Sequence, residues 1–195
     1  MTQLTLPGFD VPPPAPEHRI FFAAMPDPVT AARIAGMAES LQSGKGGVLR
    51  TERLHVTLCS LGDFAYVPDA TIARARAAAE RIDARSFGVT FDQLLSFNGR
   101  PGHRPLVLAG QAGLETLIDF QQRLRDALGK AGLRVSRARF TPHVTLLYGE
   151  RRPDQYKIDP ITWTVREFVL IHSWLGRTHY DVIGRWPLTI GSTSA

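Results

Sequence analysis

Two copies of one tetrapeptide, His-Val-Thr-Leu, stand out in this 195-residue sequence, the first beginning at His55 and the second at His143. Imidazole gains or loses a proton near neutral pH, so two histidines can serve one substrate as general acid and general base. A threonine hydroxyl can donate a hydrogen bond to a non-bridging phosphate oxygen, where charge accumulates during phosphoryl transfer. The two copies therefore contain the groups needed for phosphodiester chemistry without a metal.

This chemistry requires each histidine to face the same side as its threonine. Side chains alternate along a β-strand, so His55 shares a face with Thr57, and His143 shares a face with Thr145. The valine and leucine of each copy then point into a core. If an internal duplication relates the two strands, the two His-Thr pairs meet across one cleft. The alternative is two ordinary strands, because valine, threonine and leucine are common strand residues.

The segments that must position these residues alternate between strands and helices. We expect strands at 19–24, within 49–61, and at 87–97, 106–109, 140–148, 163–175 and 180–188, with helices at 30–41, 69–84 and 114–128. Clusters of proline, glycine and aspartate separate them. Interleaved strands and helices with a strand-rich C-terminal part indicate an α+β fold.

Composition excludes several classes of protein. With 44% hydrophobic and 21% charged residues the chain is ordinary for a globular protein, and its length suits one domain or two small lobes that share a core. No apolar run is long enough for a membrane-spanning helix, and we expect no secretory signal. Cys59 is the only cysteine, which excludes an internal disulfide and a cysteine-rich metal site. We expect a cytoplasmic monomer with no cofactor, no metal and no membrane contact.

The charge balance favours an anionic partner without deciding its identity. Lysine and arginine number 23 against 18 acidic residues, a net charge of +5, and only three of the cations are lysines. Arginine binds phosphate with a planar fork of donors, so the excess suits RNA. An excess of this size is equally consistent with ordinary solvated surface.

At the two motifs the chain resembles the 2H phosphoesterase superfamily, and most closely its LigT-like branch, the RNA 2′,3′-cyclic phosphodiesterases also called 2′-5′ RNA ligases. The resemblance covers about residues 18 to 190, including the opening strand at 19–23 and the closing hairpin from Ser173 to Leu188. It implies two similar lobes with antiparallel sheets around a central cleft, related by a pseudo-twofold axis. It also implies that the protein opens RNA 2′,3′-cyclic phosphate ends to 2′-phosphates.

The resemblance also implies roles for the motif residues. In the family the first histidine is usually the proton donor, which falls here on His55. The second is the acceptor, which falls on His143. Thr57 and Thr145 would contact the phosphate.

The chain departs from the family pattern at two places. Relatives often carry an arginine shortly after the second motif, whereas Tyr148 stands there, with Arg151 and Arg152 just beyond as possible substitutes. We therefore name Tyr148 and Arg151 as further candidates for substrate contacts. Relatives also commonly place a carboxylate before the serine of the closing hairpin, where this chain has His172 before Ser173.

Other functions stay open at this point. The substrate could instead be a small cyclic nucleotide, the enzyme could work reversibly as a 2′-5′ RNA ligase, or the cleft could bind RNA or nucleotides without turnover. RNA binding would use a basic rim with exposed aromatic rings that stack on bases. Phe97, Trp174 and Tyr180 are the candidates for such rings.

The N-terminal segment, residues 1–17, is rich in proline and is expected to be a flexible tail ahead of a single bilobal domain, residues 18–195. Its start, residues 3–9, loosely resembles short apolar peptides that dock into bacterial sliding clamps. The alternatives are docking on its own domain or disorder.

Overall fold

The computed structural model describes residues 13–42, 47–149 and 155–190. Within these ranges the helices are α1 (Pro28–Leu41), α2 (Asp69–Ala79), α3 (Glu115–Lys130) and the short 3₁₀ helix η1 (Thr51–Arg53). The strands are β1 (His18–Ala24), β2 (Gly47–Val48), β3 (Val56–Phe64), β4 (Phe87–Ser96), β5 (Arg104–Ala109), β6 (His143–Gly149), β7 (Gln155–Val165), β8 (Glu167–Trp174) and β9 (His179–Pro187). The predicted α+β class is confirmed.

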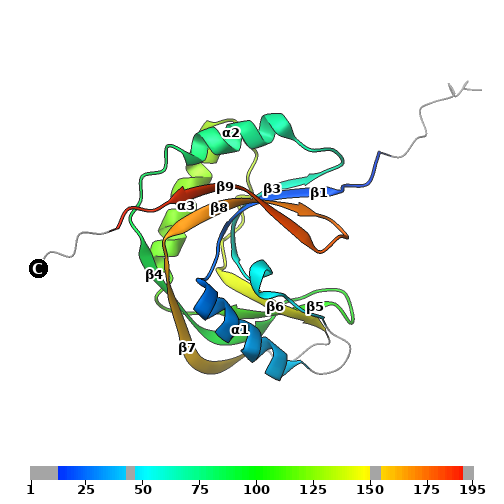
Figure 1. Cartoon of the computed structure of the whole chain (residues 1–195), viewed down its shortest axis with the longest axis vertical. Coiled ribbons are helices and arrows are strands. Elements are labelled where there is room, and N and C mark those ends of the chain that lie inside the picture. The colour runs from blue at the N-terminus through cyan, green and yellow to red at the C-terminus, as the bar shows by residue number, and fades with distance from the viewer. Residues whose placement is uncertain (1–12, 43–46, 150–154, 191–195) are drawn as a thin grey trace, which may run out of the picture.

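The strands form one antiparallel sheet that divides into two halves (Figure 1). The order is β7-β4-β5-β6-β3-β1-β8-β9, with β2 beside β6. The halves meet where β6 pairs with β3, through Val56 opposite Val144. Each half carries one motif strand at this junction. In the chain a strand and a helix precede each motif strand, β1 and α1 before β3, and β5 and α3 before β6, with β2 and η1 inserted between α1 and β3. The two lobes with a pseudo-twofold relation, expected from the resemblance, are confirmed.

Each helix of these repeated units crosses to the other half. α1 follows β1 but packs against β6 and β7, and α3 follows β5, contacts β4 of its own half and also reaches β3 and α2 (Figure 1). Asp27 begins α1 by accepting hydrogen bonds from the amides of Val29 and Thr30, so two otherwise free donors are satisfied. The exchange of helices joins the halves through a common core.

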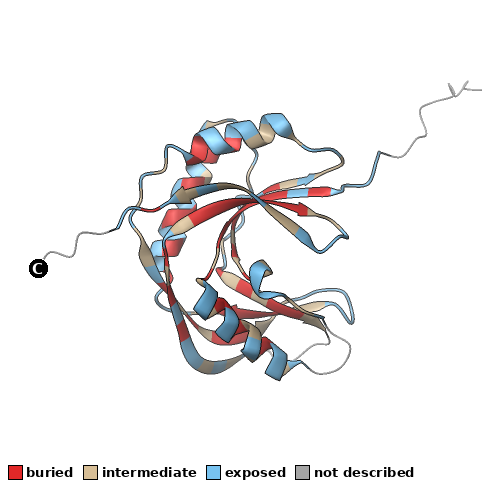
Figure 2. Ribbon diagram, in the orientation of Figure 1, coloured by how far each residue is buried: buried red, intermediate tan, exposed pale blue. Residues whose placement is uncertain are grey.

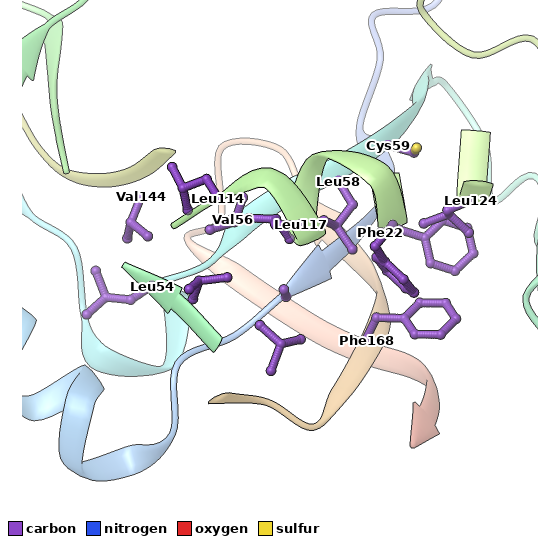
Figure 3. Close-up of a cluster of buried hydrophobic side chains, with 14 of the residues drawn as sticks. Phe22, Leu54, Val56, Leu58, Cys59, Leu114, Leu117, Leu124, Val144 and Phe168 are labelled. Carbon is purple, nitrogen blue, oxygen red and sulfur yellow. The ribbon is translucent and has the colours of Figure 1, made fainter. Parts of the chain in front are cut away.

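The core lies on the helix-covered face of the sheet (Figures 2 and 3). Val56 and Val144 are buried there beside Leu54 and Leu114, at the junction of the halves. A smaller cluster on the opposite face contains Phe21, Ala23, Val169 and Ile171, with Tyr180 packed against it. β1 is apolar from Ile20 to Ala24 because alternate residues enter the two clusters, and the smaller cluster supports the site described below.

Several strand boundaries differ from the expectation, most by one to three residues, and two of the differences have an evident structural context. The strand expected to finish at 61 continues to Phe64, because Gly62 has φ of +121° and a bulge at Leu61 absorbs one extra residue opposite β1. The strand expected at 163–175 is two strands, β7 and β8, which separate at Arg166. The sequence gives no sign of this break, because no glycine or proline stands at it and the residues on both sides are typical of strands.

β1 begins at His18, and residues 13–17 before it are exposed. The expected clamp-like peptide and most of the tail lie outside the described residues, so the division of the chain after residue 17 stays a prediction. Among the helices described, none has the length and apolar character required to cross a bilayer.

Candidate active site

The two motifs meet at one cavity of about 590 Å³ between the halves of the sheet. His55, Thr57, His143 and Thr145 all line it, and so does Tyr148. The single strand pair that joins β3 to β6 places the motifs side by side, and their valines occupy the core beneath. A slip of one residue in either strand would turn its histidine into the core, so the buried valines fix the register of the site.

Both imidazoles are held in the same way. Nδ1 of His55 lies 2.7 Å from the carbonyl oxygen of Arg53, and Nδ1 of His143 lies 2.7 Å from that of Thr141. A carbonyl oxygen only accepts, so Nδ1 carries the hydrogen in each ring. Nε2, at the far edge of the ring, is then left to take up a proton when neutral or to release one when charged.

Aromatic rings surround the two histidines. The ring centroids of Phe21 and Tyr180 lie 5.0 Å and 5.7 Å from that of His55, and Phe97 meets His143 edge-on at 4.9 Å. Burial lowers the pKa of His55 to about 4; the Arg53 carbonyl opposes this shift, while the charges of Arg53 and His143 add to it. In the free protein His55 is therefore neutral at neutral pH.

Arg53 is a cavity residue that the sequence reasoning missed. Its guanidinium carbon lies 4.4 Å from the centre of the Tyr180 ring, a cation–π contact. Its Nε is buried without a hydrogen-bond partner, and among the described residues no carboxylate pairs with it. Its place two residues before His55, where η1 leads into the first motif, was the signal that could have revealed it.

A second arginine at the cavity, Arg19, is already paired. Its Nε and one terminal nitrogen each donate to Asp63 at 2.7 Å, in a two-pronged ion pair. The hydrogen bond from Arg19 holds the pKa of Asp63 below its usual value. Of the two cavity arginines, Arg53 is thus the one whose positive charge is free to meet an anion.

Tyr148 occupies the place where the resemblance led us to expect an arginine. Its ring stacks on His103 with centroids 4.3 Å apart, and burial raises the pKa of its hydroxyl, while a hydrogen bond with Thr145 acts the other way. The side chain is therefore a neutral hydrogen-bonding group at the cavity. The alternatives named from the sequence, Arg151 and Arg152, lie outside the described residues.

The three aromatic candidates for base stacking separate into two groups. Tyr180 lines the cavity and Phe97 contacts His143. Trp174 does not reach the cavity: it packs on His18 and His172 and donates to Asp181 at 2.7 Å. His18 and His172 are themselves buried, and Nδ1 of His18 lies 2.9 Å from Nε2 of His172. This cluster therefore has a structural role, at the contact between β1 and the closing hairpin.

No group of three or more His, Cys, Asp or Glu side chains able to hold a metal occurs in the part of the chain that the structure describes. Asp63, the carboxylate at the cavity wall, is bound to Arg19. The groups gathered here are two imidazoles, two threonine hydroxyls, the hydroxyls of Ser60, Tyr148 and Tyr180, and an unpaired guanidinium, which together suit a phosphate ester.

Comparison with known proteins agrees with this assembly. Residues 25–176 match the family model described as the 2′-5′ RNA ligase superfamily. The chain is similar to crystal structures of E. coli LigT in apo form (TM-score 0.72, 25% identity) and complexed with 3′-AMP (TM-score 0.73, 26% identity). Each alignment covers 90% of this chain and 99% of LigT.

The structure of TT0787 from Thermus thermophilus has the same fold, with a TM-score of 0.72 at 20% identity over 88% of this chain and 98% of that one. No curated protein matches the sequence. The family model spans well over half of the chain and includes both motif strands. The chain therefore belongs to the 2′-5′ RNA ligase superfamily of 2H phosphoesterases.

Proposed function

We propose that this protein is a metal-independent phosphodiesterase that opens RNA 2′,3′-cyclic phosphate ends to 2′-phosphates. The observation that carries the proposal is the matched pair of imidazoles at one cavity, each with Nδ1 tied to a backbone carbonyl and each beside a threonine. Family membership supports phosphoester chemistry, and the residues at the cavity supply its groups.

In the proposed reaction one neutral histidine removes a proton from water, whose oxygen forms a bond to phosphorus. The bond from phosphorus to the ribose 3′-oxygen breaks, and the other histidine, protonated, gives its proton to that oxygen. Thr57 and Thr145 donate hydrogen bonds to the non-bridging oxygens, where charge develops. Arg53 supplies a positive charge beside them. The product carries a 2′-phosphate and a free 3′-hydroxyl.

The assignment of acid and base to the two histidines has two conflicting indications. The family pattern makes His55 the donor, whereas the lowered pKa of His55 favours its neutral, accepting form in the free protein. A cyclic substrate with sulfur in place of the 3′-bridging oxygen separates the two roles, because a thiolate leaves without a proton. Loss of the acid would be rescued by this substrate, and loss of the base would not.

The direct test of the proposed function uses the purified protein, EDTA and an RNA that ends in a 2′,3′-cyclic phosphate. We expect turnover to a product with a 2′-phosphate and no 3′-phosphate, identified by mass and by its response to enzymes specific for each end. Absence of turnover, dependence on an added metal, or a 3′-phosphate product would overturn the proposal.

Small cyclic nucleotides are a second candidate substrate class. A cavity of about 590 Å³ lies within the usual size range of small-molecule sites. Solved complexes of E. coli LigT contain 3′-AMP and ATP. The ratio of kcat/KM for cyclic-phosphate RNA and for a cyclic mononucleotide decides between the two classes.

A further inference from the structure

Two further hollows continue the active cavity along the surface. A smaller one of about 270 Å³ shares Thr57, Ser60 and His143 with the cavity, and its outer wall comes from the segment that precedes β6. A larger one of about 790 Å³ lies along the C-terminal turns of α3 and shares Val135 with the smaller one. A path therefore leads from the catalytic histidines to the end of α3.

This path is strongly basic. The cations along it are Arg125, Lys130, Arg134, Arg137 and Arg139. Asp126 is the single carboxylate among the described residues that line the two outer hollows, and its carboxylate accepts a hydrogen bond from Gln122. We call the five cations the basic track.

The charges of the basic track are available to a ligand. Lys130, Arg134, Arg137 and Arg139 are exposed, and across the described ranges none of the track cations forms an ion pair. Arg125 donates to the neutral side-chain oxygen of Gln122. Like charges close together repel one another, and a polyanion that lies among them relieves that repulsion and releases its own condensed counterions.

We propose that the basic track binds the single-stranded RNA that precedes the cyclic phosphate end, an inference that rests on the proposed function. The terminal phosphate lies between the histidines, and the upstream backbone passes the smaller hollow at Arg139 and continues along Arg137 and Arg134 toward the end of α3. Contacts of this kind are made to phosphates and carry no sequence preference. The natural substrate is then an RNA strand, with a cyclic mononucleotide as a poorer one.

The test compares two substrates, an RNA of about ten nucleotides with a 2′,3′-cyclic phosphate and a cyclic mononucleotide, at salt concentrations from about 50 to 200 mM. In Arg134→Gln/Arg137→Gln we expect kcat/KM for the RNA to fall about tenfold or more, mainly through KM, with mononucleotide turnover unchanged within about twofold. The negative slope of log kcat/KM against log salt should become shallower by about 0.7 for each phosphate that the variant no longer neutralises.

The matched control is Arg33→Gln/Lys157→Gln, which removes the same charge from α1 and β7, at positions that line none of the three hollows. Both control positions are exposed, and we expect neither substrate to be affected. The proposal is overturned if the control lowers RNA turnover as much as the track variant, if the track variant lowers both substrates equally, or if it lowers neither.

Binding separates failure of this inference from failure of the proposed function. The probe is a fluorescent RNA of the same sequence that ends in a 2′-phosphate, titrated with each variant. If the wild type turns over neither substrate, the proposed function fails, and the track still stands if wild type and control bind the RNA more tightly than the track variant. Equal affinity of the wild type, the control and the track variant for this RNA would show that the basic track does not bind RNA.

Discussion

Each motif histidine is oriented by the backbone two residues before it. The carbonyls of Arg53 and Thr141 fix the tautomer, so neither ring has to reorganise when a substrate enters. The two tethers match because the two halves of the sheet match. Chemistry that needs one acid and one base can therefore be assembled from two copies of one local structure.

Replacing either histidine tests this arrangement directly. We expect His55→Ala and His143→Ala each to reduce turnover of a cyclic-phosphate RNA by about a hundredfold to ten-thousandfold, the usual contribution of general acid or base catalysis. Thermal unfolding should show an intact fold. His179→Ala is the control, since His179 is exposed and bound to Asp181. An active double variant at 55 and 143 would rule out the two-histidine reaction.

Burial of His55 also makes stability depend on pH. Its pKa of about 4 in the folded protein lies below the ordinary value of 6.5, so between these values the unfolded chain binds more protons than the folded one. Stability should therefore be full above about pH 6.5 and fall as pH drops toward 4, by at most about 3 kcal/mol. Urea unfolding of wild type and His55→Gln checks this, and an equal loss in both proteins would contradict it.

Arg53 is expected to act on the phosphate through both its charge and its planar shape. Arg53→Gln should lower kcat/KM by about tenfold to a hundredfold, the scale of one charge-assisted contact. Arg53→Lys should recover only part of the loss, because an ammonium keeps the charge but lacks the flat fork that lies on Tyr180. Full recovery by lysine would show that charge alone matters, and an unaffected glutamine variant would remove Arg53 from the site.

At the scale of elements, the spacing of residues in the sequence predicted the features that depend on neighbouring residues, namely strand faces and helix bounds. The alternation of His55 and Thr57 with buried valine and leucine predicted which side chains share a face, and the helical spacing of leucines predicted α3 nearly to its ends. The crossing of α1 and α3 between the halves has no local signal, because it depends on which apolar surface each helix meets. Arg53 was missed because the sequence cannot show that its guanidinium lies at the cavity on Tyr180, with Nε buried and without a hydrogen-bond partner.

The end of β3 is a boundary that the glycine in the sequence misplaced, because the strand continues through a bulge to Phe64. Glycine usually interrupts a strand, yet Gly62 allows β3 to continue past the cavity at φ of +121°. Gly62→Ala should cost about 1–3 kcal/mol of stability through backbone strain, since the added methyl would meet Phe64 only at 3.5 Å, an ordinary contact. Gly88→Ala in β4, where nothing lies within 4 Å, is the control. Equal urea midpoints for the two variants would exclude the strain.

At the scale of the whole molecule, the cavity exists only because the two halves are held together. His55 and His143 belong to different halves, which share one strand pair and the core beneath it. The two lobes around a cleft were predicted from the resemblance of the motifs. Composition and periodicity alone could not predict them, because neither specifies how two half-sheets meet. The expected monomeric state and cytoplasmic location stay predictions.

The N-terminal boundary gives a prediction at this same scale. The amide of Glu17 donates to the carbonyl of Phe64, and its own carbonyl accepts from the amide of Leu175, so Glu17 already belongs to the sheet. None of the described cavity residues precedes Arg19. A chain that begins at Glu17 should therefore keep its thermal midpoint and its kcat/KM on a short cyclic-phosphate RNA. Lost turnover at an unchanged midpoint would mean that residues 1–16 contribute to the active site, and that the domain begins before residue 17.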